Sequence, residues 1–140
     1  LLQQYLSKQI MVGVNDAATA VSVATYSAKM ISMIEKCNTA GIIPIIGQIL
    51  PWTNGNNTQH TRREEMNAWI VDYCTTNNIL TFNASARIGI DRVGFPSGNL
   101  RNLAAGMSDD GVHLTELGKD GVVDELEEVL RNNLPIIVKR

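Results

Sequence analysis

The stretch Ile42-Ile43-Pro44-Ile45-Ile46-Gly47-Gln48-Ile49-Leu50 decides the fold. It is a continuous apolar run rich in β-branched residues, and such runs are typical of a strand that helices cover on both faces. Pro44 cannot donate a hydrogen bond to a neighbouring strand, so we expect strand pairing to begin at or after it. The segments on either side must then supply the covering helices.

Upstream of this run, the sequence predicts the tail of a helix over residues 1–8 and a short strand from Gln9 to Gly13. Ala17 to Cys37 then has the spacing of a single helix. Its core face is expected to consist of apolar residues three and four apart: Val21, Ala24, Ala28, Ile31 and Ile34.

Downstream, Thr58 to Thr76 predicts a second helix with a clear apolar stripe. The stripe consists of Met66, Trp69, Ile70, Tyr73 and Cys74. Ile79 to Asn83 has the composition of a third strand. The sequence therefore continues to alternate strand and helix after the central run.

The last part of the chain predicts a long loop from Ala84 to Ser108 and then a helix that Thr115 caps and that ends near Asn132. Its core-facing residues are expected to be Val122, Leu126 and Val129. A loop of about two dozen residues is long for a compact domain, and substrate contact is the usual reason for such a length.

This alternation predicts an α/β fold in which a parallel sheet forms the middle of a three-layer αβα sandwich, within a single domain over residues 1–140. Ligands bind beyond the carboxyl ends of the strands in such sheets. Gly13–Asp16, Pro51–Asn57 and Ala84–His113 all leave carboxyl ends. We therefore expect Asn15 and His113 to converge.

Composition disfavours several classes of function. The net charge is −2 with no basic cluster, which gives no electrostatic reason to expect nucleic acid as a partner. The longest apolar run is too short to span a membrane. Cys37 and Cys74 lack the spacing of metal ligands and are expected to be free buried thiols. Neither a metal nor a cofactor is expected. A nucleotide-binding domain is disfavoured because no glycine-rich phosphate loop occurs.

Two short stretches carry the chemistry: Gly13-Val14-Asn15-Asp16 and Asp110-Gly111-Val112-His113. Gly13 permits a tight turn, and asparagine followed by aspartate favours a turn or a helix start. A histidine three residues after an aspartate, just before a helix, has a carboxylate within reach of its imidazole. Each pattern alone is common, but the two in this order with strand-helix units between them are more specific.

With these stretches, the sequence resembles the SGNH (GDSL) hydrolases, whose third and fifth sequence blocks have the forms GxND and DxxH. The helix that carries Asn67 and the position of Gly118 after the histidine agree with the family. The resemblance implies a flavodoxin-like SGNH hydrolase fold, incomplete at its N-terminal side, and a serine esterase activity. Carbohydrate O-acetyl groups are one expected class of substrate.

The family's roles apply where residues match. His113 would be the general base and Asp110 would hold its imidazole in the correct tautomer. Asn15 would donate its side-chain N–H to the oxyanion, and Gly13 would let the backbone turn Asn15 into the site. The neighbouring Asp109 is expected to be a solvated turn residue.

The family's first block, a Gly-Asp-Ser triplet, does not occur in this sequence. Ser108 is close to His113 along the chain but lies in no nucleophile motif. We therefore expect the nucleophile to come from an N-terminal segment outside this chain. The expected partner of the chain is that segment or another copy of the chain. Alone, the chain is expected to be inactive.

The sequence leaves several roles open. Trp52 and Asn54 follow the central strand and are assigned to substrate contact with Gly13, although Trp52 could stack on a sugar ring or simply plug its loop. Five arginines could bind an acidic substrate, but solvated surface is the stronger expectation: Arg62, Arg63, Arg87, Arg92 and Arg101. The alternative function is a non-catalytic carbohydrate-binding or assembly module of a surface or phage adhesin.

Overall fold

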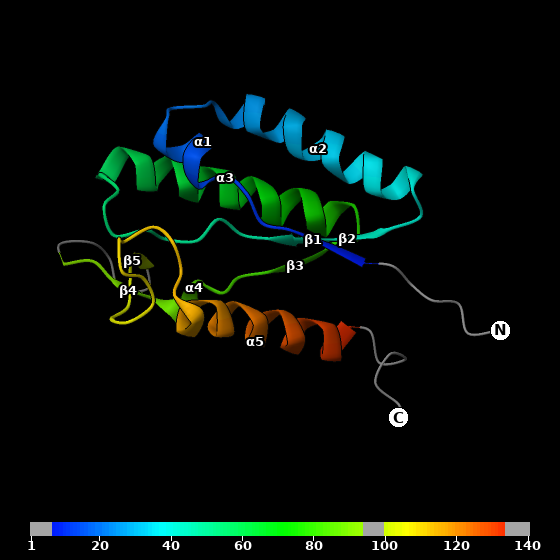
Figure 1. Cartoon of the computed structure of the whole chain (residues 1–140). Coiled ribbons are helices and arrows are strands. Elements are labelled where there is room, and N and C mark those ends of the chain that lie inside the picture. Colours follow the sequence, from blue (N-terminus) through cyan, green and yellow to red (C-terminus); the bar gives the residue numbers. More distant parts are fainter. Residues whose placement is uncertain (1–6, 94–99, 134–140) are drawn as a thin grey trace. The chain divides into compact units, whose positions relative to one another are not determined.

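A computed structural model describes residues 7–93 and 100–133 of the chain (Figure 1). The chain forms two compact units. The first unit consists of Leu1–Ile49 and Thr61–Thr81, and the second consists of Leu50–His60 and Phe82–Arg140. The expectation of a single domain over residues 1–140 stays a prediction.

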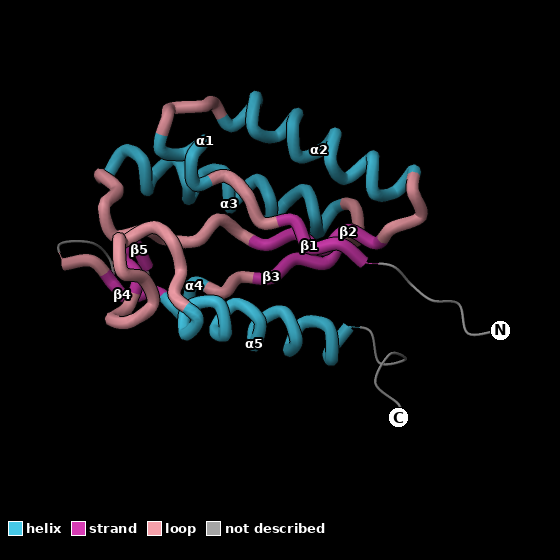
Figure 2. Tube along the Cα trace, viewed as in Figure 1, coloured by secondary structure: helices cyan, strands magenta, loops and turns pink. Residues whose placement is uncertain are grey.

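A three-stranded sheet in the order β1-β2-β3 is built from Ser7–Ile10, Ile43–Gly47 and Leu80–Phe82 (Figure 2). β1 pairs with β2 in parallel, from Ser7 opposite Ile43 to Ile10 opposite Ile46. The Thr81 hydroxyl donates to the Ile46 carbonyl at 2.8 Å and links β3 to β2. The protein therefore has the predicted α/β fold with a parallel sheet and helices.

The observed bounds of β1 and β2 differ from the predicted ones. Ser7 and Lys8 belong to β1 and not to a helix, while residues 1–6 lie outside the described part of the chain. Pairing of β2 starts at Ile43, before Pro44, and the strand ends at Gly47 instead of Leu50. The composition of the apolar run predicted a strand but not the residue at which its pairing with the neighbouring strand ends.

The helix predicted from Ala17 to Cys37 is two helices, α1 (Val14–Ala18) and α2 (Val23–Thr39). Ala20, with φ of 66°, breaks the chain direction between them. The Ser22 hydroxyl then accepts from the Thr25 N–H at 3.1 Å and begins a new helix as its N-cap.

The core face of α2 also differs from the prediction, which placed Ala24 and Ala28 in the core. Both alanines are exposed. Ile34 is buried as predicted, and the rest of the buried face consists of Tyr26, Met30 and Cys37. These larger side chains bury more apolar surface at helical spacing, so the helix packs with them toward the sheet.

Helix α3 (Asn57–Thr76) confirms the predicted stripe, because Met66, Ile70 and Cys74 are buried. Trp69 stacks on Tyr73 with ring centroids 5.1 Å apart. Within the first unit, α2 and the Thr61–Thr76 part of α3 lie on the same face of the sheet (Figure 1). The first turn of α3 belongs to the second unit.

The second unit contains α4 (Ser85–Ile88), β4 (Gly89–Asp91), β5 (Leu100–Leu103) and α5 (Glu116–Asn133). β4 and β5 pair in antiparallel fashion. The long loop predicted from Ala84 to Ser108 is thus partly regular structure, with residues 94–99 outside the described ranges. Short elements of three or four residues give little periodic signal, which is why the sequence did not reveal them.

Helix α5 packs on α4 through polar and apolar contacts. The Arg87 guanidinium donates to Glu125 at 2.7 Å and also to Glu128. A Cβ on Gly121 would lie 2.7 Å from the Ile88 side chain, so glycine lets the two helices approach closely. Val122 is buried as predicted, whereas Leu126 and Val129 are half-buried.

Both cysteines are free and buried, as the sequence predicts. Across residues 7–93 and 100–133, none of the helices has both the length and the apolar character needed to cross a membrane.

Candidate active site

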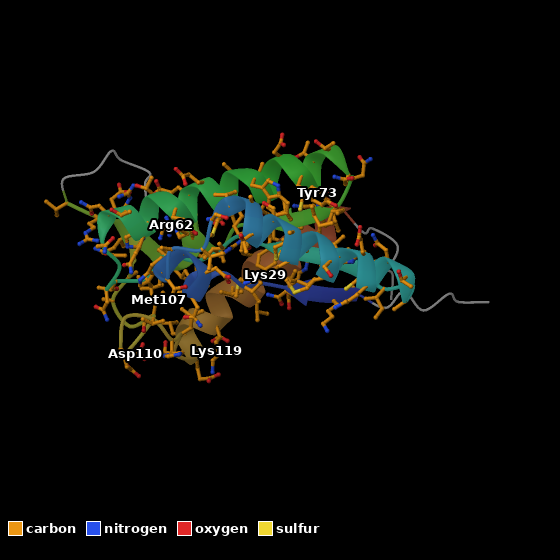
Figure 3. All side chains as sticks on the ribbon, turned by 90° about the horizontal axis from the view of Figure 1, so that it is seen from above. Lys29, Arg62, Tyr73, Met107, Asp110 and Lys119 are labelled. Atoms are coloured by element: carbon orange, nitrogen blue, oxygen red, sulfur yellow. The ribbon has the colours of Figure 1, made fainter. Side chains whose placement is uncertain are left out.

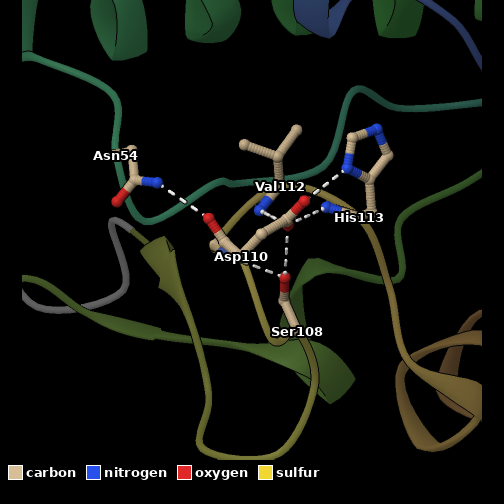
Figure 4. A network of polar contacts seen from close by, with 6 residues as sticks. Asn54, Ser108, Asp110, Val112 and His113 are labelled. Carbon is tan, nitrogen blue, oxygen red and sulfur yellow. Dashed lines mark hydrogen bonds and ion pairs between the residues drawn. The ribbon is translucent and has the colours of Figure 1, made fainter.

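The Asp110-Gly111-Val112-His113 segment forms a tight turn just before α5 (Figure 4). His113 Nδ1 lies 2.6 Å from Asp110 Oδ2. The other carboxylate oxygen of Asp110, Oδ1, accepts from the Val112 and His113 backbone N–H groups, each at 2.8 Å. The carboxylate therefore fixes the backbone of the turn and the imidazole that the turn presents.

These contacts set the charge of Asp110 and the tautomer of a neutral His113. The hydrogen bond from the His113 side chain, followed by those from the His113 and Val112 backbone, lowers the pKa of Asp110 well below its usual range. An ionised carboxylate can only accept hydrogen bonds, so the proton of a neutral His113 resides on Nδ1. Nε2 then points away from Asp110 with its lone pair available (Figure 4).

Hydrogen bonds from Ser108 and from Thr115, just before α5, stabilise the turn and its connection to the helix. Ser108 Oγ accepts from the Gly111 N–H at 2.9 Å and donates to Asp110 Oδ1 at 3.2 Å. Thr115 donates its N–H to the Met107 carbonyl at 3.0 Å, and its Oγ1 accepts from the Gly118 N–H at 3.3 Å. Thr115 therefore caps α5 as predicted, while the Ser108 hydroxyl stabilises the turn.

The loop after the central strand meets this turn within the second unit. The Thr53 N–H donates to the Gly111 carbonyl at 2.8 Å, and Asn54 Nδ2 donates to the Asp110 carbonyl at 2.8 Å. Gly111 has φ of 82°, and a Cβ there would lie 3.0 Å from the Asn54 side chain. Glycine is required at this position for both its conformation and its close packing.

Trp52, the other residue of this loop assigned to substrate contact, is 4% exposed. Its ring lies 4.6 Å from that of His60, at an interplanar angle of 35°. A Cβ on Gly55 would come within 2.6 Å of His60 and 2.7 Å of Trp52, so the loop packs tightly around both rings. This burial supports the alternative in which Trp52 plugs its own loop.

In the first unit, Gly13 makes the sharp turn that leads from β1 into α1. Its φ is 129°, and a Cβ would lie 2.5 Å from Ile49 and 2.9 Å from Tyr26, so only glycine fits. The Tyr26 hydroxyl donates to the Val12 carbonyl at 3.0 Å. Burial, together with the nearby charge of Asp16, raises the pKa of Tyr26 above its ordinary value. The hydroxyl thus remains a donor.

Asn15 is exposed at the second position of α1. Two contacts hold this short helix within the first unit, and they come from Lys29 and Arg62, which Figure 3 labels. Lys29 Nζ lies 3.2 Å from Asp16 Oδ1, and Arg62 Nη1 donates to the Ala17 carbonyl at 2.7 Å. Asn15 belongs to the first unit and His113 to the second. Their convergence therefore stays a prediction.

The expectation of a solvated surface is wrong for Arg63 and Arg101, whereas Arg87 is exposed as expected and Arg62 and Arg92 are half-buried. Arg62 and Arg92 donate to backbone carbonyl groups, and Arg87 pairs with two glutamates of α5. The two that are almost fully buried are Arg63, 4% exposed, and Arg101, 5% exposed. These arginines support the fold. By contrast, Asp109 is exposed, in keeping with the expected turn residue.

Sequence reasoning did not predict the structural contacts of three residues, two in the first unit and one in the second. Tyr26 holds the backbone before Gly13, Ser108 closes the histidine turn, and Asn67 binds the backbone of Ile49. A serine two residues before an aspartate is a turn signal that could have indicated Ser108. The contacts of Tyr26 and Asn67 are 14 and 18 residues apart in sequence, where local patterns carry no information. Among the described residues, no three His, Cys, Asp or Glu side chains gather in a way that could hold a metal ion.

Solved structures with the same fold come from several proteins. A candidate acylhydrolase from Bacteroides fragilis NCTC 9343 is 20% identical, with a TM-score of 0.72 over 91% of this chain and 62% of that one. A GDSL-like lipase from Bacteroides thetaiotaomicron VPI-5482 is 22% identical, with a TM-score of 0.70 over 90% and 62% of the two chains. The C-terminal domain of the Drosophila Oskar protein is 13% identical, with a TM-score of 0.67 over 94% and 64%.

This chain thus spans less than two thirds of the length of these solved structures. No curated protein is similar enough in sequence to count as a relative. The model of the GDSL-like lipase/acylhydrolase family, however, matches residues 9–120, far more than half of the 140 residues. The matched range contains both the Gly13–Asp16 and the Asp110–His113 segments. This chain therefore belongs to the GDSL-like lipase/acylhydrolase family.

Proposed function

We propose that this chain supplies the general base and its orienting carboxylate to a serine ester hydrolase. The observation that carries the proposal is the 2.6 Å hydrogen bond between His113 Nδ1 and Asp110 Oδ2, on a histidine whose side chain is 86% exposed. The bond fixes the tautomer, and the exposure leaves Nε2 open to a hydroxyl nucleophile and a substrate.

The chemistry of such a pair is acyl transfer in two steps. Nε2 of His113 takes the proton of a serine hydroxyl as its oxygen attacks the acyl carbon of the ester. The imidazolium, stabilised by Asp110, then returns that proton to the departing alcohol oxygen. A water molecule attacks the acyl-serine in the same way, and the carboxylic acid leaves while the serine regains its proton.

Asn15 is proposed to stabilise the oxyanion that forms during each attack. Its carboxamide is exposed at the start of α1, immediately after the Gly13 turn. Tyr26 and the close packing around Gly13 hold this turn rigidly, and a preorganised donor stabilises charge more effectively than a mobile one. The rigidity of the turn supports this assignment.

The nucleophile is proposed to come from a segment outside this chain, because no Gly-Asp-Ser triplet occurs in the sequence. Ser108 is a poor alternative, since its hydroxyl is engaged with Gly111 and Asp110. β1 lies at the edge of the described sheet, where a further strand could pair. The partner would be that segment or another copy of this chain.

The proposed substrates are esters of small molecules or carbohydrates, with O-acetyl groups as the first to test. The experiment compares the complete protein with this 140-residue chain in the hydrolysis of p-nitrophenyl acetate. We expect turnover by the complete protein, nearly total loss in His113→Gln, and no turnover by this chain beyond that of free imidazole. Robust turnover by this chain that Ser108→Ala abolishes would contradict the proposed source of the nucleophile.

A non-catalytic carbohydrate-binding or assembly module remains the second candidate, and the absence of Gly-Asp-Ser from this chain is the observation that favours it. It predicts a complete protein that also lacks the triplet and turns over no ester. Determining whether Gly-Asp-Ser follows an apolar strand upstream separates the two candidates before any assay.

A further inference from the structure

We infer that Asn54 is a positioning residue that holds the Asp110–His113 turn in its working geometry. Only the consequence for catalysis rests on the proposed function. The contacts that position the turn lie within the second unit, between the loop after the central strand and the turn before α5 (Figure 4).

Two neighbouring carbonyl groups of the turn are bound by two neighbouring residues of the loop. The Thr53 N–H donates to the Gly111 carbonyl, and Asn54 Nδ2 donates to the Asp110 carbonyl, both at 2.8 Å. Paired hydrogen bonds of this kind fix an orientation, whereas a single bond leaves rotation free. The turn is therefore held at a defined angle to the loop.

Hydrogen bonds hold both the side-chain carboxylate and the backbone carbonyl of Asp110. Its carboxylate accepts from Val112 and His113, while its carbonyl accepts from Asn54. The carbonyl contact fixes the backbone from which the carboxylate extends toward His113. Movement of that backbone would change the 2.6 Å distance to Nδ1 directly.

The loop is itself anchored, so it can act as a support. Trp52 is buried against His60, and Arg92 Nη1 donates to the Gly55 carbonyl at 2.7 Å. On the far side of Gly55, Asn56 and Gln59 exchange two hydrogen bonds of 2.9 and 2.8 Å between side chain and backbone. Asn54 thus extends toward the turn from a loop that is fixed on both sides.

The test uses NMR on this 140-residue chain. Asn54→Leu keeps the size of the side chain but removes the donor, and Asn54→Ala removes the side chain beyond Cβ. Asn57→Leu, an exposed asparagine three residues further on, is the matched control. The signals are the titration of the Asp110 carboxyl carbon and the exchange of the proton on His113 Nδ1.

In both Asn54 variants we expect the Asp110 carboxylate to bind its proton at least about three times more tightly than in the wild type, because a looser turn weakens its hydrogen bonds. The Nδ1 proton should exchange faster, while Asn57→Leu should match the wild type. Unchanged signals in folded Asn54→Leu would overturn the inference. Loss of the folded spectrum in both Asn54 variants would overturn it too, since Asn54 would then be a general stability residue.

In the complete protein, a positioning role predicts a lower kcat with little change in KM for Asn54→Leu, whereas direct contact with the substrate predicts a higher KM. This assay depends on the proposed esterase activity, but the NMR measurement does not. A complete protein without activity would contradict the proposed function and leave the NMR result to decide the role of Asn54.

Discussion

The Asn67 carboxamide takes the place of a neighbouring strand at Ile49. Its Oδ1 accepts from the Ile49 N–H at 2.7 Å, and its Nδ2 donates to the Ile49 carbonyl at 3.0 Å. Ile49 lies two residues beyond the end of β2 and is 1% exposed, so its backbone needs partners that the ladder no longer supplies. Asn67 thereby stabilises the backbone of the segment that follows β2.

Asn67→Leu should destabilise the chain strongly, because it keeps the side-chain volume but leaves the two polar groups of Ile49 without their partner. The expected cost is about 1–3 kcal/mol for each group, measured by urea denaturation. Asn77→Leu is the control, since its amide binds the exposed carbonyl of Tyr73 and should cost less than about 0.5 kcal/mol. Equal losses in the two variants would show that Ile49 finds other partners.

The adjacent aspartates should behave very differently in the complete protein. Asp110→Asn replaces the acceptor for His113 Nδ1, which frees the imidazole to adopt the wrong tautomer, and kcat/KM should fall by about 10²–10⁴. Asp109→Asn makes the same chemical change at an exposed neighbour and should stay close to the wild type. The opposite ranking would show that the Asp-x-x-His spacing had been assigned to the wrong carboxylate.

The sequence predicted most elements whose residues bury a continuous apolar stripe. Met66, Ile70 and Cys74 of α3 follow helical spacing and face the core as expected. It failed where tertiary packing or one backbone angle decides, as at Ala20, whose positive φ separates α1 from α2. It also placed Ala24 in the core, because the spacing of small residues alone does not tell which helix face will meet a sheet.

The candidate site divides in the same way. Asp110 and His113 are three residues apart, so turn geometry alone brings them together, and the sequence was enough to predict their hydrogen bond. The contact between Asn54 and Asp110 joins residues 56 positions apart, and only the folded chain reveals it. Asn54 was expected at the site for a different reason, namely that its loop leaves the carboxyl end of a strand.

The turn before α5 should survive to a lower pH than an ordinary aspartate would allow. The pKa of Asp110 is lower in the folded protein than in the unfolded chain, where it is about 3.9. Its carboxylate therefore favours the folded turn fully above that value, and this contribution is lost as the pH falls through the lower folded pKa. The Val112 and His113 amide signals in NMR should persist below pH about 3.9 and shift only at lower pH.

Asp110→Asn supplies the control for this titration, because an amide does not titrate. Its Val112 and His113 amide signals should show no step in the acid range, whereas Asp109→Asn should keep the wild-type step. A step at an ordinary aspartate pH in the wild type would mean that the hydrogen bonds to the Asp110 carboxylate are weak in solution.

Asn15 follows directly on the Gly13 turn, which orients it. In the complete protein, Asn15→Ala should lower kcat by about 10²–10³ with little change in KM, because the oxyanion exists only near the transition state. Tyr26→Phe removes the donor to the Val12 carbonyl and should give a smaller loss in the same direction, since the Gly13 turn would be held less rigidly. Asn38→Ala, an exposed asparagine of α2, should leave both constants unchanged. A higher KM with an unchanged kcat in Asn15→Ala would instead show that Asn15 binds the ground-state substrate.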